Sequence, residues 1–338
     1  MAMFDKLLDN LKASRKTIVF TEGTDARILD AAARLLSEGL MDVILCGNVD
    51  EVKAAAAAGN YNVDAATVLD PATYPEMDAM VAEMAALRKG KMTEEECRAA
   101  LSKSNYFGTM LVKMGKADAL LGGATYSTAD TVRPALQIIK TRKGASLVSS
   151  CFILFREKDG VEEKICMGDC AINLSYEDKL DKDGNVVQTG AQKLAEVAVE
   201  SARTAAFFGI DPKVAVLSFS TYGSGKGGTV KLSHDAVEEA RKLDPTLVVD
   251  GEFQFDAAVS AEVAKTKCPD SKVAGQANTF IFPLIEAGNI GYKIAQRLGG
   301  YAAYGPILQG LNAPINDLSR GCNAEEVYAM AIITAGMA

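Results

Sequence analysis

The chain has 338 residues and a formal net charge of −8, with 49% apolar and 24% charged residues. This length predicts two domains or one large α/β unit with a sizeable core. The negative charge argues against general binding to nucleic acid. We expect no membrane span and no export, because no run of 18 apolar residues occurs and the charged N-terminus lacks the apolar centre of a secretory signal.

The cysteines and the single histidine argue against several kinds of site. Seven cysteines are scattered without tight pairing, which is typical of reduced thiols in a cytoplasmic protein. Cys166 and Cys170 are four residues apart, but no second pair or histidine follows them, so we expect no metal site. His234 lies at the polar start of a predicted helix, which favours a surface position over a catalytic one.

The first part of the chain alternates between helices and strands. We expect a helix over 4–15, a buried strand over 16–23 that ends in a glycine turn, and a further helix capped by Asp25. A second strand over 41–47 and an alanine-rich helix follow. This alternation predicts a parallel sheet covered by helices.

Two segments of this part carry groups suited to anions. Between predicted helices over 76–89 and 93–104, Arg88 and two lysines either bind an anion or compensate a helix dipole, and the residues alone favour the dipole. Further on, a strand ends in two glycines before the hydroxyls of Ser127 and Thr128, and a helix with Arg133 in its first turns begins near residues 128–131. Such a turn at the carboxyl end of a parallel strand suits phosphate or carboxylate.

Two details refine these elements. Pro134 predicts that its helix starts only one or two residues before it, because proline is best tolerated in the first turn.

The glycine-rich loop over 219–228 is neither a P-loop nor a dinucleotide fingerprint, because Gly227 follows Lys226 and the glycine spacing is wrong. Its backbone amides can still cradle an anion.

The pattern changes near residue 145, where we place a domain boundary. Two apolar runs around the turn at 158–160 predict a β-hairpin, and the polar segment around 182–184 is a surface hairpin or a loop. Helices and strands then alternate again. We expect one domain from residues 1–145 plus 305–338 and a second from 146–304, with the site between them.

The stretch from Gly305 to Cys322 has the composition of a long, ordered turn. It leads into an apolar helix, so its end directs backbone N–H groups at whatever binds there. Arg320 offers a charged fork and Ser319 a hydroxyl, which together indicate an anion site with a polar group beside it. Asn323 and Glu326 have the spacing of a capping box.

Four long segments resemble phosphate acetyltransferases, and the resemblance extends over nearly the whole chain. They are DGEFQFDAA, NTFIFPLIEAGNIGYKIAQRL, GPILQGLNAPINDLSRGC and GGATYSTADTVRPALQIIK. The resemblance implies two α/β/α domains with mostly parallel sheets, similar to isocitrate and isopropylmalate dehydrogenases, with an active-site cleft between them. It also implies a homodimer that converts acetyl-CoA and phosphate reversibly into acetyl phosphate and coenzyme A.

Carried over residue by residue, the resemblance implies that Ser319, Arg320 and Glu326 are catalytic. It implies that Arg133 and Arg88 bind the phosphate or coenzyme A, and we add the neighbouring Ser127 and Thr128. Coenzyme A is a substrate, and we expect no permanently bound cofactor. Two positions depart from the family pattern: Glu326 stands where relatives often carry aspartate, and Gln276 stands where they often carry lysine.

Several alternatives stay open at this point. Glu326 is either the general base or only a helix cap, and Cys322 is either an acyl carrier or a small buried group. The chain resembles phosphate butyryltransferases and the acetyl-CoA-sensing segments of some malic enzymes too. Because it begins at Met1 without an upstream dehydrogenase region, we expect a free-standing enzyme. A metal-dependent decarboxylating dehydrogenase shares the fold but finds weak support in Asp250 and Asp256.

Overall fold

The computed structural model describes residues 2–338 and divides into two compact units. Unit 1 comprises Met1–Lys143 and Leu311–Ala338, and unit 2 comprises Gly144–Gly310. The first boundary lies close to the expected one at residue 145. The second lies beyond residue 305, because the strand Ala302–Gln309 pairs with Ser149–Lys158 of unit 2.

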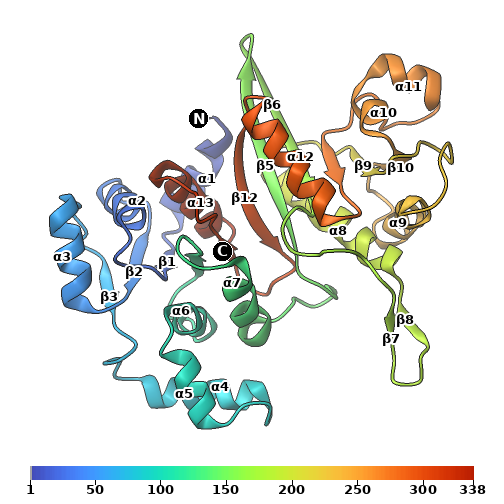
Figure 1. Cartoon of the computed structure of the whole chain (residues 1–338). Coiled ribbons are helices and arrows are strands. Elements are labelled where there is room, and N and C mark those ends of the chain that lie inside the picture. The colour runs from blue at the N-terminus through green and yellow to red at the C-terminus, as the bar shows by residue number, and fades with distance from the viewer. Residues whose placement is uncertain (1) are drawn as a thin grey trace. The chain divides into compact units, whose positions relative to one another are not determined.

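Unit 1 is built on a parallel sheet with the strand order β13-β4-β1-β2-β3 (Figure 1). The strands are β1 (Thr17–Phe20), β2 (Asp42–Cys46), β3 (Thr67–Leu69), β4 (Ala119–Gly122) and β13 (Ile315–Asp317). The apolar runs of β1 and β4 are buried, as expected for parallel strands covered on both faces. The prediction of a parallel sheet is confirmed for this unit.

Helices pack on both faces of this sheet. They are α1 (Ala2–Ala13), α2 (Ala26–Ser37), α3 (Val49–Gly59), α4 (Met77–Arg88), α5 (Glu94–Leu101), α6 (Ser104–Lys113), α7 (Thr128–Pro134), the π-helix η1 (Ala135–Ile139) and α13 (Ala324–Gly336). A core cluster beneath α4, α6 and η1 contains the fully buried Met80, Met84 and Phe107. On the sheet, α13 contacts β1 and β4 and is itself covered by α1 and α2.

The helix α7 begins at Thr128, within the predicted range, but Pro134 lies at its end rather than in its first turn, so the later start expected from the proline is wrong. Proline has no N–H for the carbonyl four residues earlier, which belongs to Asp130. That carbonyl accepts a hydrogen bond from Asn105 Nδ2 at 2.7 Å instead. The helix then widens into the π-turn η1, and the side chain of Asn105 compensates for the missing backbone donor.

Unit 2 contains a mixed sheet with the strand order β10-β9-β11-β6-β5-β12. Its strands are β5 (Ser149–Lys158), β6 (Val161–Gly168), β9 (Val214–Leu217), β10 (Val249–Phe253), β11 (Thr279–Ile281) and β12 (Ala302–Gln309). The predicted hairpin is confirmed as β5–β6, which turns at Asp159 and Gly160. The polar excursion is a second hairpin, β7 (Lys179–Leu180) with β8 (Val186–Gln188), rather than a loop.

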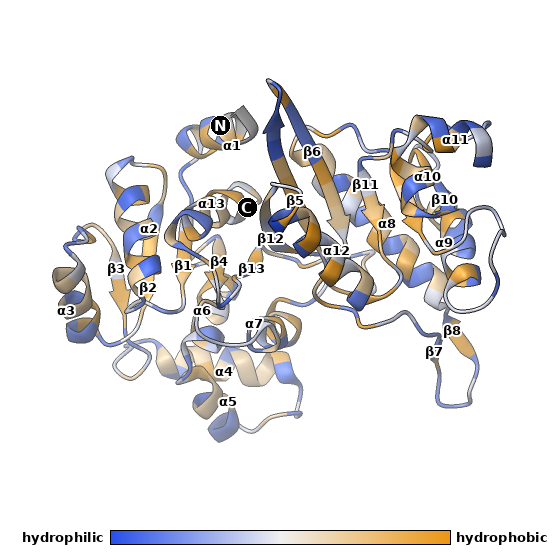
Figure 2. Ribbon diagram, turned by 45° about the horizontal axis from the view of Figure 1, so that its top comes forward, coloured by the Kyte–Doolittle hydropathy of each residue, from blue (hydrophilic) through white to orange (hydrophobic). Residues whose placement is uncertain are grey.

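Two groups of helices cover the faces of this second sheet. One face carries α8 (Gly190–Phe207) and α9 (Val230–Leu243), and the other carries α10 (Phe255–Val259), α11 (Ala261–Lys267) and α12 (Ile285–Arg297). Figure 2 shows the apolar residues concentrated on the strands and on the inner sides of the helices. Both units are therefore α/β/α sandwiches with mostly parallel sheets, as expected.

The stretch from Gly305 to Cys322 is not one long turn, and that prediction is wrong. Its first part belongs to β12 and a later part to β13, so only the segments 310–314 and 318–323 lie outside the strands. Pro306 is tolerated because β12 is an edge strand with an irregular register between Tyr304 and Ile307. Among residues 2–338, no helix has both the length and the apolar character needed to cross a membrane.

Candidate active site

The short turn between β13 and α13 presents two of the expected site residues to solvent. Ser319 and Arg320 are exposed, and the turn is closed by a bond from Cys322 N to Ser319 O at 2.9 Å. Gly321 N donates weakly to Ser319 Oγ at 3.3 Å. The hydroxyl proton of Ser319 and the guanidinium of Arg320 therefore remain available to a ligand.

The helix after this turn starts with the predicted capping box. Asn323 Oδ1 accepts from Glu326 N at 2.9 Å, and Glu326 Oε2 accepts from Asn323 N at 3.1 Å. The structure thus confirms the capping role of Glu326. Its other oxygen, Oε1, makes no hydrogen bond within the described part of the chain and is open to a second role.

A second turn, between β4 and α7, lies beside the first because β4 and β13 are neighbours. Leu318 N donates to Gly122 O at 2.7 Å, so the two turns start from adjoining backbone. Gly123 has φ +100°, and a Cβ there would lie 2.3 Å from Asp317 Oδ1. Glycine is required at this position by both its conformation and the close approach.

A buried carboxylate and a partly buried one hold this second turn in place. Glu22 Oε1 accepts from the N–H groups of Gly123 and Thr125 at 3.0 and 3.1 Å. Asp317 accepts from the hydroxyls of Thr128 and Thr131 at 2.6 and 2.5 Å. The hydroxyl proton of Thr128, expected to contact substrate, is therefore donated to Asp317.

The hydroxyl proton of Ser127 is also used within the turn, because its Oγ donates to Asp130 Oδ2 at 2.7 Å. Both hydroxyls act within the turn, and only their oxygens remain to accept from a ligand. Glu22 and Asp317, which do the holding, were missed by the sequence reasoning. A carboxylate at or just beyond the end of each of two apolar runs was the available signal.

The environment of Asp317 changes its titration. Burial raises its pKa from 3.8 to about 6, against the lowering effect of the Thr128 and Thr131 hydroxyls, and the charge of Glu22 raises it further. Because the folded protein binds this proton more tightly than the unfolded chain, the stabilising contribution is greatest below about pH 4. It is lost as the pH rises through 6.

We therefore expect Asp317→Asn to flatten the dependence of stability on pH. A shift of about two pKa units corresponds to about 3 kcal/mol, which the wild type loses between pH 4 and pH 7 relative to the variant. Urea unfolding of both proteins at several pH values measures this difference. Parallel curves for the two proteins would show that Asp317 titrates normally.

The expected substrate-binding arginines share one neighbourhood. Arg133 is exposed on α7, and Arg88 is partly buried at the end of α4. Burial raises the pKa of Tyr106, and the guanidinium groups of Arg133 and Arg88 both oppose this rise, so both lie near its ring. Arg88 Nε is buried and lacks a hydrogen-bond partner in residues 2–338, which leaves a donor unsatisfied.

Arg27 connects the two turns and was also missed. From the first turn of α2 its Nη1 donates to the carbonyls of Arg320 and Cys322, and its Nη2 donates to that of Ala124. The same guanidinium opposes the effect of burial on Cys322, whose pKa still rises to about 11. A thiol so reluctant to ionise is a poor acyl acceptor, which argues against Cys322 as a carrier.

The glycine-rich loop of unit 2 already binds a carboxylate of the protein itself. Glu252, which is 1% exposed, accepts from Ser220 Oγ at 2.8 Å and from Gly223 N at 2.7 Å. His234 Nδ1 lies 3.3 Å from the other oxygen, and the side chain of His234 is 61% exposed. These contacts assign part of the loop, and His234, to structure.

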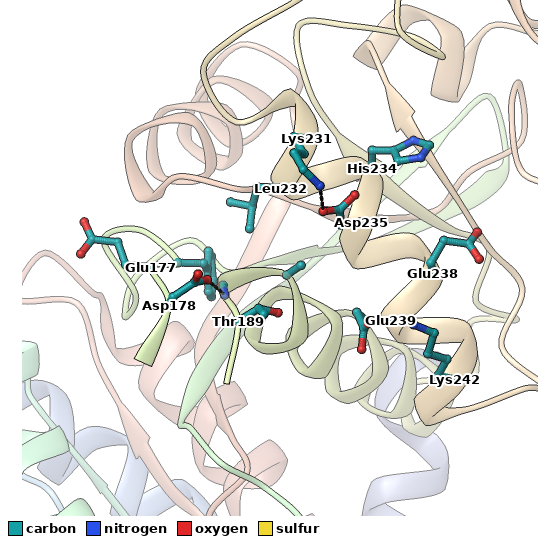
Figure 3. A pocket seen from close by; sticks show the side chains of 13 residues that line it. Glu177, Asp178, Thr189, Lys231, Leu232, His234, Asp235, Glu238, Glu239 and Lys242 are labelled. Atoms are coloured by element: carbon teal, nitrogen blue, oxygen red, sulfur yellow. Dashed lines mark hydrogen bonds and ion pairs between the residues drawn. The ribbon is translucent and has the colours of Figure 1, made fainter. Parts of the chain in front are cut away.

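A cavity of about 800 Å³ in unit 2 is poorly suited to an anion (Figure 3). Five carboxylates line it, and its lysines are paired with two of them: Lys231 with Asp235, and Lys242 with Glu239. No cluster of three or more potential metal ligands occurs in residues 2–338. The exposed arginines of unit 1 are therefore the better candidates for binding phosphate groups.

Residues 2–335 match the family described as phosphate acetyl/butaryl transferase. The chain belongs to this family. The phosphate acetyltransferase of Bacillus subtilis (strain 168) is 50% identical over 336 residues, covering 99% of each protein. The match over the full length of both chains includes both candidate turns.

Solved structures agree with this assignment. The phosphotransacetylase from Streptococcus pyogenes has a TM-score of 0.91 at 49% identity, covering 99% of this chain and 97% of that one. A branched-chain phosphotransacylase from Enterococcus faecalis V583 has a TM-score of 0.65 at 18% identity, covering 95% of this chain and 98% of that chain, and shows the fold alone. The chain is a transferase of this α/β fold.

Proposed function

We propose that this chain transfers an acetyl group reversibly between coenzyme A and inorganic phosphate. The observation that carries the proposal is the exposed Ser319–Arg320 pair on a turn held beside the turn that leads into α7 with Arg133, in a chain half identical to a phosphate acetyltransferase over its full length. Both turns lie at the carboxyl ends of parallel strands, where ligands bind in α/β sheets.

Charge neutralisation is the first task of the site. Acetyl phosphate and the phosphates of coenzyme A are anions that repel each other when bound together. Arg320 binds the phosphoryl group that leaves, and Arg133 and Arg88 bind coenzyme A, with Arg88 Nε supplying an unused donor. Guanidinium groups suit this task because they stay protonated and make paired hydrogen bonds to phosphate oxygens.

The second task is to stabilise the oxyanion that forms when sulfur attacks the acetyl carbon. Ser319 lies in an exposed turn, and its hydroxyl proton is donated to no group within residues 2–338. A donor held in place before the reaction stabilises developing charge without reorganisation, and removing one such donor typically costs about 10²–10³-fold in kcat.

The third task is to form the thiolate. An ordinary carboxylate with a pKa of about 4.3 accepts a proton from a thiol of pKa about 8.5 at a cost of about 6 kcal/mol. Bound substrate excludes water from Glu326 Oε1 and places an arginine beside the thiol. Both effects lower the free-energy cost of moving the proton from the thiol to the carboxylate. Glu326 then takes the proton, sulfur bonds to the acetyl carbon, and the carbon–oxygen bond to phosphate breaks.

The transfer is direct, without an acyl-enzyme. Cys322 is buried with a raised pKa, and the only histidine lies on α9 in unit 2, bonded to Glu252. The test is exchange of labelled phosphate into acetyl phosphate in the absence of coenzyme A. We expect no exchange until coenzyme A is added, whereas rapid exchange without it would establish a covalent intermediate.

We also propose that the chain acts as a cytoplasmic homodimer, and α12 supports the dimer. Ile290 and Ile294 of this helix and its C-cap Leu298 follow each other at a spacing of four and are 58%, 54% and 85% exposed. An apolar cavity of about 860 Å³ beside them is lined by Phe219 and other aromatic side chains. An apolar stripe of this kind on a free monomer indicates a covered surface, and a second copy offers the same stripe.

Ile294→Glu is therefore expected to yield a monomer. A charge in the middle of the stripe would be buried without a partner on both sides of the two-fold axis. Sedimentation should give twice the 35.7 kDa of one chain for the wild type and a single chain for the variant. Leu243→Glu, at an equally exposed apolar position on α9, is the control and should stay dimeric. A monomeric wild type would contradict this assignment.

A further inference from the structure

Arg27 uses all five of its N–H donors on fixed oxygen atoms. Nε and Nη2 donate to the two carboxylate oxygens of Asp25 at 2.9 and 2.8 Å. The second proton of Nη2 goes to Ala124 O at 2.9 Å, and Nη1 donates to Arg320 O and Cys322 O at 2.9 and 3.1 Å. A guanidinium has five donors in a rigid plane, so this arrangement fixes three chain segments at once.

The three segments are the start of α2 and the two turns of the candidate site. Asp25 is the N-cap of α2 and accepts from Arg27 N as well, so the arginine is anchored in its own helix. The bonds inside the turn after β13 set only its local shape. Its position relative to the turn after β4 depends on Leu318 N–Gly122 O at one end and on Arg27 at the other.

We propose that Arg27 is a positioning residue for acyl transfer, which rests on the proposed function. It holds the carbonyl groups of Arg320 and Cys322 turned toward its own positive charge. Without Arg27, these carbonyl groups could turn toward the anion site and repel the phosphate. The backbone of Arg320 would also be free to move, and its side chain would lose its position. Arg27 thereby places Ser319 and Arg320 for the transition state without touching substrate itself.

The effect should fall on one half of the site. The turn after β4 has its own anchors, since Asp317 holds Thr128 and Thr131 and Glu22 holds Gly123. Loss of Arg27 therefore leaves the α7 side in place, with Arg133. The turn carrying Arg320 loses its contacts at Arg320 O and Cys322 O and becomes free to shift.

Arg34 provides a matched control on the same helix. Its Nη1 lies 2.5 Å from Glu325 Oε2, and its guanidinium stacks on the ring of Tyr328 at 3.9 Å. It therefore joins α2 to α13 through side chains only and leaves the carbonyls of the turn untouched. Arg34→Gln measures the cost of weakening the contact between α2 and α13.

The test compares Arg27→Gln, Arg27→Lys and Arg34→Gln in acetyl transfer. Displacement of catalytic groups by about 1 Å costs on the order of 10²-fold, so Arg27→Gln should lower kcat by about that factor with the KM for coenzyme A unchanged. Arg27→Lys, which keeps the charge but not the fork, should lie between it and the wild type. Arg34→Gln should keep the wild-type kcat. Equal kinetics for both glutamine variants would overturn the proposal.

Hydrogen exchange separates this inference from the proposed function. The amides of Gly321 and Cys322 should exchange faster in Arg27→Gln and at the wild-type rate in Arg34→Gln, whether or not the chain transfers acetyl groups. Unchanged exchange would show that Arg27 does not hold the turn. If the wild type were inactive but the exchange rates were as expected, the proposed function would be wrong, whereas the role of Arg27 in fixing the turn would stand.

Discussion

Arg320→Ala is expected to lower kcat/KM for acetyl phosphate by about 10³-fold, as loss of a charged group that contacts the transition state typically does. The side chain is exposed, and the bond from Arg27 goes to the backbone carbonyl of Arg320, which the substitution keeps. The free energy of unfolding should therefore change by no more than about 0.5 kcal/mol, as for an ordinary surface substitution. Initial rates and urea unfolding measure the two quantities.

Arg15→Ala is a suitable control for the loss of one positive charge. Arg15 is also in unit 1 and about half exposed, but it pairs with Asp42 at the amino end of the sheet, opposite the candidate site. Its removal should leave the rate unchanged. Equal activity in Arg320→Ala and Arg15→Ala would mean that the turn after β13 is not the site.

Glu326→Gln is expected to reduce kcat by about 10²-fold or more, the usual effect of losing a general base. Glutamine at this position keeps both bonds of the capping box, because its amide oxygen accepts from Asn323 N as the carboxylate does. The variant therefore separates proton transfer from helix capping. Stability should remain that of the wild type, as checked by urea unfolding.

Two further variants complete this experiment. Glu326→Ala removes the cap as well and should lose about 1 kcal/mol of stability in addition to activity. Glu325→Gln changes the charge of the adjacent residue, which pairs with Arg34, and should leave kcat unchanged. Full activity in Glu326→Gln would assign Glu326 to the cap alone, with the thiol proton lost to water.

Much of the fold was predicted from local signals in the chain. Asp25 caps its helix, and Asn323 and Glu326 form their box, because these contacts involve residues only two or three positions apart. The hairpin around Asp159 and Gly160 was predicted for the same reason. The alternation of strands and helices was enough for the sandwich architecture, since buried parallel strands have a recognisable composition.

Other features depend on contacts that are distant in sequence. The segment from Gly305 looked like a turn, but pairing of β12 with β5 makes it a strand, and an edge position accommodates Pro306. Pro134 is tolerated late in α7 because Asn105 satisfies the freed carbonyl. Such compensation cannot be read from the neighbours of a proline in the sequence.

The candidate site shows the same division. Ser319, Arg320 and Arg133 were found because they lie in or just after turns with glycines and hydroxyls. Arg27 was missed because its role comes from carbonyl groups almost 300 positions away in the chain. The hydroxyl of Thr128 was assigned to substrate, whereas in the structure its proton goes to a buried carboxylate.

The most direct test of the central claim is the formation of acetyl-CoA from acetyl phosphate and coenzyme A by the purified wild-type chain, followed by thioester absorbance. We expect rapid, enzyme-dependent formation that requires the thiol and reverses when phosphate and acetyl-CoA are supplied. No turnover in either direction, while acetyl-CoA still binds, would contradict the assignment and favour a sensing domain.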